Sequence, residues 1–119
     1  DYDGRYAQLL NGRFEVSVTG FDFFANPFIG RTVPLASNDS AVFWFFKPAN
    51  FELLVKIVNG CGLNNRFWVY YAATTNVDFT LKVTDTFLPP PFNYVTYHNP
   101  LGTQFYTSVA DSDAFDTCF

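Results

Sequence analysis

The sequence NGCGLNNRFWVYYAATTNVDFTLKVTD, residues 59–85, decides the fold class of this chain. Apolar and polar side chains alternate within residues 66–71 and again within residues 77–84, which is the period-two pattern of half-buried β-strands. Polar turn residues precede the first of these segments and separate the two. The stretch therefore predicts an antiparallel β-hairpin with Cys61 at its entrance. The side chains expected to face the core are Phe67, Val69, Tyr71, Val77, Phe79, Leu81 and Val83.

Similar short segments fill the rest of the chain. Asn11-Gly12 supplies the positive φ angles of a tight turn before the alternating residues 13–19. The acidic run at residues 111–116 is expected to form a short helical turn. About seven or eight strands with turn signals between them, and no long helical period, predict an all-β fold, an antiparallel, immunoglobulin-like β-sandwich. The other expected strands are residues 32–35, 41–46, 52–58 and 93–97.

Length and composition indicate one domain. The chain has 119 residues, so residues 1–119 are expected to form a single sandwich around one core. Residues 1–10 have no clear period and are expected to be either an extended N-terminal arm or an edge strand. Aromatic residues make up 21% of the sequence, which favours strands, and the formal net charge of -4 provides no basic surface for nucleic acid. The longest uninterrupted apolar run, residues 67–73, is too short to span a membrane.

Cys61 and Cys118 are the only cysteines. Two interpretations are open: a disulfide that ties down the C-terminal end, or two buried free thiols. We favour the disulfide, because a cysteine next to the C-terminus in a polar context has little core in which to be buried. A bond between these positions would stabilise the fold by roughly 4 kcal/mol. The expected setting is therefore extracellular or at the cell surface. A sequence that starts at Asp1 and contains no methionine also predicts export by a cleaved leader.

No catalytic or cofactor-binding constellation is recognisable, so we expect neither enzymatic activity nor a cofactor. His98 is the only histidine, and it lies outside any nucleophile motif. Glu15 and Glu52 are the only glutamates. Each is expected on an outer strand face, which does not suit the paired carboxylates of a glycosidase.

Two polar patterns are weaker candidates for sites. Asp111, Asp113 and Asp116 have an oxygen-rich spacing that a calcium ion can use. The complete calcium-loop signature is missing, and a solvated turn is the preferred interpretation of these three residues. Asn38 begins the glycosylation acceptor pattern Asn-Asp-Ser on an expected loop.

Two loops carry more apolar side chains than a loop usually does. One is residues 21–30, and the other surrounds the three consecutive prolines at 89–91. Exposed apolar patches mark interfaces more often than they occur by chance, so these loops are expected to bury into a neighbouring subunit. The alternative is that they fold over the open ends of the sandwich and close its core. The candidate interface residues are Phe23, Phe24, Phe28, Leu88, Pro90 and Phe92.

The core and turn motifs together carry a resemblance. The matching segments are residues 11–14, 43–46, 52–61, 67–69, 75–77, 84–86, 99–102, 114–115 and 117–118. On these residues the chain resembles a family of small secreted bacterial β-domains with no assigned activity, which occur alone or near the ends of larger surface proteins. The resemblance implies a secreted β-domain. It implies little about chemistry, because the shared residues are core aromatics, turn formers and the cysteine pair.

The chain departs from that family at its loops and near its N-terminus. It has FDFFANPF and FLPPPFN where family members have polar loops, and it lacks the cysteines that often precede their first strand. Both departures favour self-association. We therefore predict a non-enzymatic extracellular structural subunit that forms a filament or surface layer with copies of itself through its aromatic loops and through strand addition. The alternative is a secreted module that binds carbohydrate or another surface polymer on rings such as Trp44, Trp68, Tyr70 or Tyr94.

Overall fold

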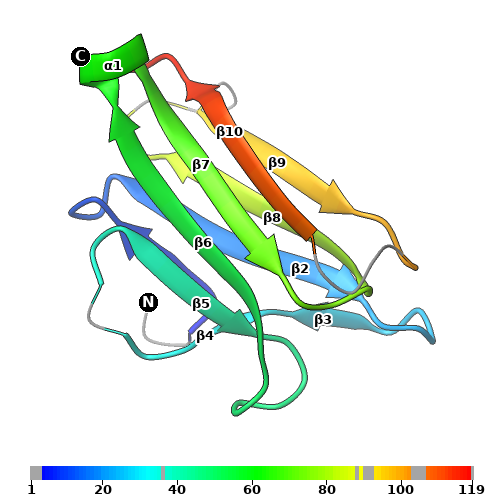
Figure 1. The fold of residues 1–119 in the computed structure, drawn as a ribbon. Helices are drawn as coiled ribbons and strands as arrows, with labels where there is room; N and C mark the ends of the chain where they lie inside the picture. The colour runs from blue at the N-terminus through cyan, green and yellow to red at the C-terminus, as the bar shows by residue number, and fades with distance from the viewer. Residues whose placement is uncertain (1–3, 36, 88, 90–92, 103–106, 119) are drawn as a thin grey trace.

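The chain folds as two antiparallel five-stranded sheets packed face to face, as Figure 1 shows for a computed structural model. The structure describes residues 4–35, 37–87, 89, 93–102 and 107–118. The first sheet has the order β1-β2-β8-β9, with β3 also paired to β2, and the second has the order β10-β7-β6-β5-β4. The predicted all-β sandwich is confirmed. The first sheet consists of β1 (Ala7–Leu9), β2 (Phe14–Phe21), β3 (Pro27–Ile29), β8 (Asp78–Asp85) and β9 (Tyr94–Asn99). The second consists of β4 (Arg31–Thr32), β5 (Ser40–Trp44), β6 (Phe51–Gly60), β7 (Arg66–Ala73) and β10 (Thr107–Phe115), with helix α1 (Cys61–Asn64) between β6 and β7.

The core lies between the sheets and is built by the alternation visible in the sequence. Every second side chain of β2, β7 and β8 is buried, because a strand with one face on the core buries residues with a period of two. The rings of Phe14, Phe43 and Phe79 are fully buried. All seven side chains expected to face the core from residues 67–83 do so, namely Phe67, Val69, Tyr71, Val77, Phe79, Leu81 and Val83.

The predicted hairpin of residues 59–85 is wrong in its pairing. β7 pairs with β6 and β10, whereas β8 pairs with β2 and β9, so the segment crosses from one sheet to the other after Ala73. The local hairpin is instead β6–β7, which turns through α1 with Gly60 opposite Arg66. Alternation shows only that a strand has one buried face. In a sandwich both sheets face the same core, so the pattern is the same for either neighbour.

The chain ends also differ from the sequence-based expectations. Residues 111–116 do not form a helical turn, because β10 continues to Phe115, which pairs with Phe67 of β7 across a bulge. Pairing with a long neighbouring strand overrides the weak local preference for a turn. At the other end, Ala7–Leu9 is strand β1 and pairs with β2 of the same chain, so this part of residues 1–10 is an edge strand.

A disulfide and a buried ion pair hold the end of the sandwich that carries α1. Cys61 and Cys118 are bonded, with a Cα–Cα distance of 5.7 Å, as predicted. Next to them the guanidinium group of Arg13 donates two hydrogen bonds of 3.0 Å to the carboxylate of Asp85, and the hydroxyl of Thr117 donates a third of 2.7 Å. A disulfide bond is typical of proteins in oxidising, extracellular settings. No helix in the part of the chain that the structure describes is long and apolar enough to cross a membrane.

Candidate binding pocket

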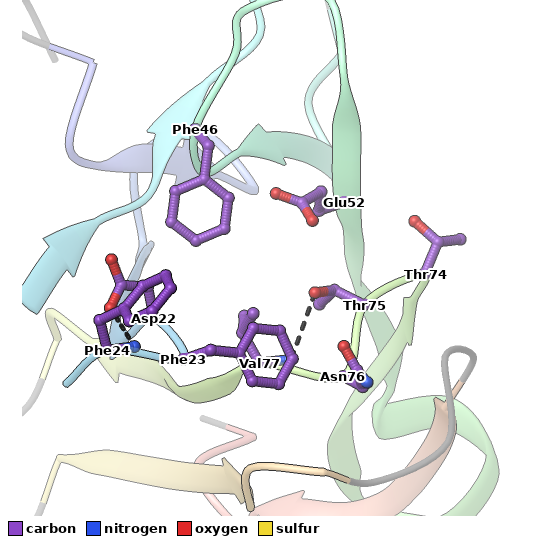
Figure 2. Close-up of a pocket in the computed structure, with 9 residues that line it drawn as sticks. All are labelled: Asp22, Phe23, Phe24, Phe46, Glu52, Thr74, Thr75, Asn76 and Val77. Atoms are coloured by element: carbon purple, nitrogen blue, oxygen red, sulfur yellow. Dashed lines mark hydrogen bonds between the residues drawn. The ribbon is translucent and has the colours of Figure 1, made fainter. Parts of the chain in front are cut away.

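A pocket of about 460 Å³ lies among three connections, which Figure 1 shows at the opposite end of the sandwich from α1. These connections are the β2–β3 turn, the β5–β6 loop and the segment that crosses from β7 to β8. Figure 2 shows the rings of Phe23, Phe24 and Phe46 around a space onto which the carboxyl group of Glu52 opens. The described residues that line it are Asp22, Phe23, Phe24, Phe46, Glu52, Thr74, Thr75, Asn76 and Val77.

Glu52 faces the interior because of a bulge in β6. Phe43 pairs with Leu53 and the next residue, Trp44, pairs with Phe51, so Glu52 is the extra residue between two paired positions. A bulge lets two consecutive side chains turn to the same face. Glu52 is therefore only 8% exposed, beside the buried Leu53. The expectation that Glu52 lies on an outer strand face is wrong for this reason.

The carboxyl group of Glu52 lacks full compensation for its burial. Burial raises the pKa of Glu52, and hydrogen bonding from the Thr75 hydroxyl and the Phe45 backbone N–H offsets only part of this effect. Its Oε2 atom is buried and accepts no hydrogen bond from the described residues. A buried polar atom without a hydrogen bond costs about 1–3 kcal/mol. Such a group is a reason to look for a ligand.

The β2–β3 turn is built around Asp22. Its Oδ1 atom accepts hydrogen bonds from the backbone N–H groups of Phe24 and Asn26, at 2.8 and 2.9 Å. Hydrogen bonds from these groups, that of Asn26 foremost, lower the pKa of the Asp22 carboxyl. Ala25 completes the turn with a positive φ of 63°. The turn leaves the ring of Phe23 56% exposed and that of Phe24 85% exposed.

The opposite wall is the crossing segment, whose polar groups are tied to the backbone. The Thr75 hydroxyl accepts a hydrogen bond of 3.3 Å from the N–H of Val77, and the Thr74 hydroxyl donates one of 3.2 Å to the carbonyl of Phe51. The side chain of Asn99 donates to the carbonyl of Val77 at 3.0 Å. These bonds hold Thr74, Thr75 and Val77 in place beside the Glu52 carboxyl group.

The predicted interface residues have different surroundings. Phe23 and Phe24 are exposed, whereas Phe28 is half-buried, with its ring 4.8 Å from Phe45 and 5.0 Å from Phe46 between centroids. Phe28 therefore helps to close the end of the core, which is the alternative weighed for this loop. Leu88, Pro90 and Phe92 lie outside the described residues.

Sequence reasoning missed Phe46 and Glu52 as pocket residues. Phe46 gave a signal, because the apolar run of residues 41–46 extends beyond the end of β5 at Trp44. Glu52 gave none, because a bulge in the middle of an alternating segment has no turn residue to mark it. The pocket depends on both residues.

The other candidate residues are not brought into a common site. Asp111 accepts a hydrogen bond of 2.7 Å from the hydroxyl of Tyr97, and Asp113 forms an ion pair of 2.8 Å with Arg66. Asp116 is exposed. Across the residues that the structure describes, no three or more His, Cys, Asp or Glu side chains are grouped so that they could hold a metal ion.

Asn38 and His98 lie at the surface. Asn38 is exposed on the loop before β5, and its side-chain oxygen accepts a hydrogen bond of 2.8 Å from the backbone N–H of Asn11. His98 lies 3.2 Å from the carboxylate of Asp78 on the neighbouring strand β8. Glycosylation of Asn38 stays a prediction.

Comparison of the chain with models of protein families, with known proteins and with solved structures finds no match. The resemblance to small secreted bacterial β-domains therefore remains a prediction from the motifs quoted above.

Proposed function

We propose that this protein is a non-enzymatic extracellular structural subunit that associates with copies of itself through one end of the sandwich. The observation that supports this most is a group of exposed rings, here called the aromatic end, at and beside the pocket. Each of its rings is about half exposed or more, although the core already holds several fully buried rings. The aromatic end consists of Phe21, Phe23, Phe24, Phe46 and Phe51.

The energy of covering these rings favours association. A phenylalanine side chain gains about 1.5–3 kcal/mol when it moves from water into an apolar contact. Several such rings at one end of the sandwich provide the apolar centre that an interface needs. An isolated domain would leave them in water, and exposed patches of this kind usually mark contact surfaces.

Strand addition is the less favoured route to assembly. β4 is a two-residue edge strand, and β10 is bulged and carries Asp111 and Asp113, which are features that protect sheet edges from pairing. β9 is an edge strand of six residues that pairs with β8 without a register shift and has alternate side chains exposed. We therefore place the main contact at the aromatic end and any strand addition at β9.

The test is the oligomeric state of the oxidised protein as a function of concentration. Light scattering after size exclusion should show assemblies that grow with concentration, and electron microscopy should show regular particles or fibres. The double variant Phe23→Ser/Phe24→Ser should weaken association at least about tenfold, since two exposed contact rings are removed. Leu63→Ser is the matched control, because Leu63 is 81% exposed but lies on α1 at the far end. A wild-type chain that stays monomeric at high concentration and forms no fibres would overturn the proposal.

A second candidate function is carbohydrate binding on the outer face of the second sheet. The rings of Trp68 and Tyr70 lie nearly parallel there, with centroids 6.0 Å apart. The indole N–H of Trp68 donates a hydrogen bond of 2.8 Å to the side-chain oxygen of Asn64. The indole ring also packs so closely on Gly60 that a Cβ atom there would overlap it, so the orientation of the ring is fixed. Flat, fixed rings suit stacking on sugar faces. Glycan binding that is lost in Tyr70→Ala without loss of folding would favour this function, and binding unchanged by Tyr70→Ala would count against it.

A further inference from the structure

We propose that the pocket at the aromatic end binds an organic ammonium group on a short hydrocarbon stem, with the carboxylate of Glu52 as its counter-ion. A lysine side chain and a free alkylamine share this chemistry. The proposal does not require self-association, because the pocket is formed by a single copy of the chain.

The surroundings of Glu52 indicate which chemical group a ligand of this pocket must carry. Its Oε2 atom is buried and has no hydrogen-bond donor from the described residues, and the Glu52 carboxyl group lines the pocket (Figure 2). A ligand that brings an N–H or O–H group to this carboxyl group would satisfy a charged acceptor, and hydrogen bonds to charged groups contribute about 1.5–3 kcal/mol. The ligand must therefore carry a donor at its inner end.

The charge of the lining favours a cation as that donor. Asp22 and Glu52 both line the pocket, and no Lys, Arg or His side chain is among its described lining residues. Hydrogen bonds within the turn favour the charged form of Asp22. Lys47 follows Phe46 in the β5–β6 loop but is exposed and outside the lining. A pocket with two acidic groups and no basic one attracts cations and repels anions.

The apolar part of the lining selects an organic cation over a metal ion. The rings of Phe23, Phe24 and Phe46 border the pocket together with Val77. Aromatic faces attract ammonium groups and pack against methylene groups. A hard metal ion would need several oxygen ligands, and no group of three or more acidic, His or Cys side chains is found among the described residues.

The polar wall provides further acceptors for an ammonium group, which has three donors. The hydroxyl of Thr74 gives its own proton to the carbonyl of Phe51, so its oxygen is left as an acceptor. The side-chain oxygen of Asn76 is a further acceptor on the same wall. A neutral sugar would use these groups as well, but it would make no use of the two carboxylates.

The test is a nuclear magnetic resonance titration at a protein concentration where the chain is monomeric. The probes are n-butylammonium, for a free amine, and Nα-acetyl-lysine methylamide, for a lysine side chain; n-butanol is the neutral control and butyrate the anionic one. Both cations should shift the signals of residues 22–24, 46, 52 and 74–77, with dissociation constants on the order of millimolar for ligands of this size. Tighter binding of one cation shows which source the pocket prefers.

Two variants make the result specific. Glu52→Gln keeps the shape of the side chain and removes its charge, so it should weaken binding of both cations at least about tenfold. Glu15→Gln is the matched control, since Glu15 lies on β2 and is hydrogen-bonded to Gln8, away from the pocket. The affinity for both cations should also fall as the pH is lowered through the raised pKa of Glu52, because the protonated carboxyl group is no longer a counter-ion. Asp22 is the other titratable group among the described lining residues. Its pKa is lowered, so Asp22 loses its charge only at a lower pH than Glu52 does.

Three results would overturn the proposal: no shifts at these residues with either cation, equal binding by n-butanol, or equal binding by Glu52→Gln. Binding of a neutral methyl glycoside in preference to the cations would assign the pocket to sugars instead. Phe23, Phe24 and Phe46 also belong to the aromatic end, so the titration is read only where the chain is monomeric, and the size-exclusion experiment decides self-association separately.

Discussion

Replacing Glu52 with glutamine should stabilise the isolated protein at neutral pH. Glu52 is 8% exposed, and one of its carboxyl oxygens accepts no hydrogen bond from the described residues. A buried unsatisfied polar atom costs about 1–3 kcal/mol, and more when it is charged. The amide has the same volume and no charge, but it keeps a polar atom at the same place. We therefore expect a net gain of about 1 kcal/mol in the free energy of unfolding, the low end of that range.

The gain should depend on pH in a defined direction. Burial raises the pKa of Glu52 in the folded state above its value in the unfolded chain. The folded protein then binds more protons than the unfolded protein between these two pKa values, so wild-type stability falls as pH rises through that interval. The difference between Glu52→Gln and the wild type should be largest at neutral pH and should shrink in acid.

Thermal unfolding from pH 3 to pH 8, with the disulfide intact, measures this effect. For a chain of 119 residues, 1 kcal/mol corresponds to a shift of about 4 °C in Tm. Glu15→Gln removes the only other glutamate and should change stability by less than about 0.5 kcal/mol. A Glu52→Gln protein that is less stable than wild type at neutral pH, or a difference that does not vary with pH, would refute the reasoning about this carboxyl group.

Two further predictions concern the opposite end of the sandwich. Cys61→Ala/Cys118→Ala removes a cross-link between residues 57 apart and should lower the free energy of unfolding by roughly 4 kcal/mol in denaturant titrations; a loss below about 1 kcal/mol would contradict the stabilising role of this disulfide. Asp85→Asn leaves the nearly buried Arg13 without its counter-ion and should cost about 3 kcal/mol at neutral pH. Burial raises the pKa of Asp85, but hydrogen bonds from Arg13, Thr117 and Phe87 outweigh it, and the pKa is lowered. This stabilisation is therefore present above the unfolded-state pKa and lost as pH falls through the folded one, so an unchanged difference in strong acid would contradict the assignment.

The pocket shows where local patterns stop being informative. Phe23 and Phe24 could be singled out from sequence, because apolar residues in a turn are visible without knowing what lies beside them. Glu52 could not, because its inward orientation follows from one residue of mismatch between β5 and β6. Thr74 and Asn76 reach the same space only because β7 and β8 belong to different sheets.

The sequence by itself determined that the fold is all-β, that the alternating apolar side chains of residues 67–83 face inward and that Cys61 and Cys118 are the one pair able to form a disulfide, whereas strands β3 and β10 were not predicted. These properties depend on the period of a single strand, or on there being only one pair to form, and they are preserved whichever strands become neighbours. The tertiary structure alone decided that residues 59–85 cross between the sheets, that a bulge turns a glutamate inward and that three distant loops enclose it. Strand partners and register are determined by contacts between segments far apart in the chain. The alternation of apolar and polar residues within a strand is the same whichever strand it pairs with, so it does not reveal those contacts.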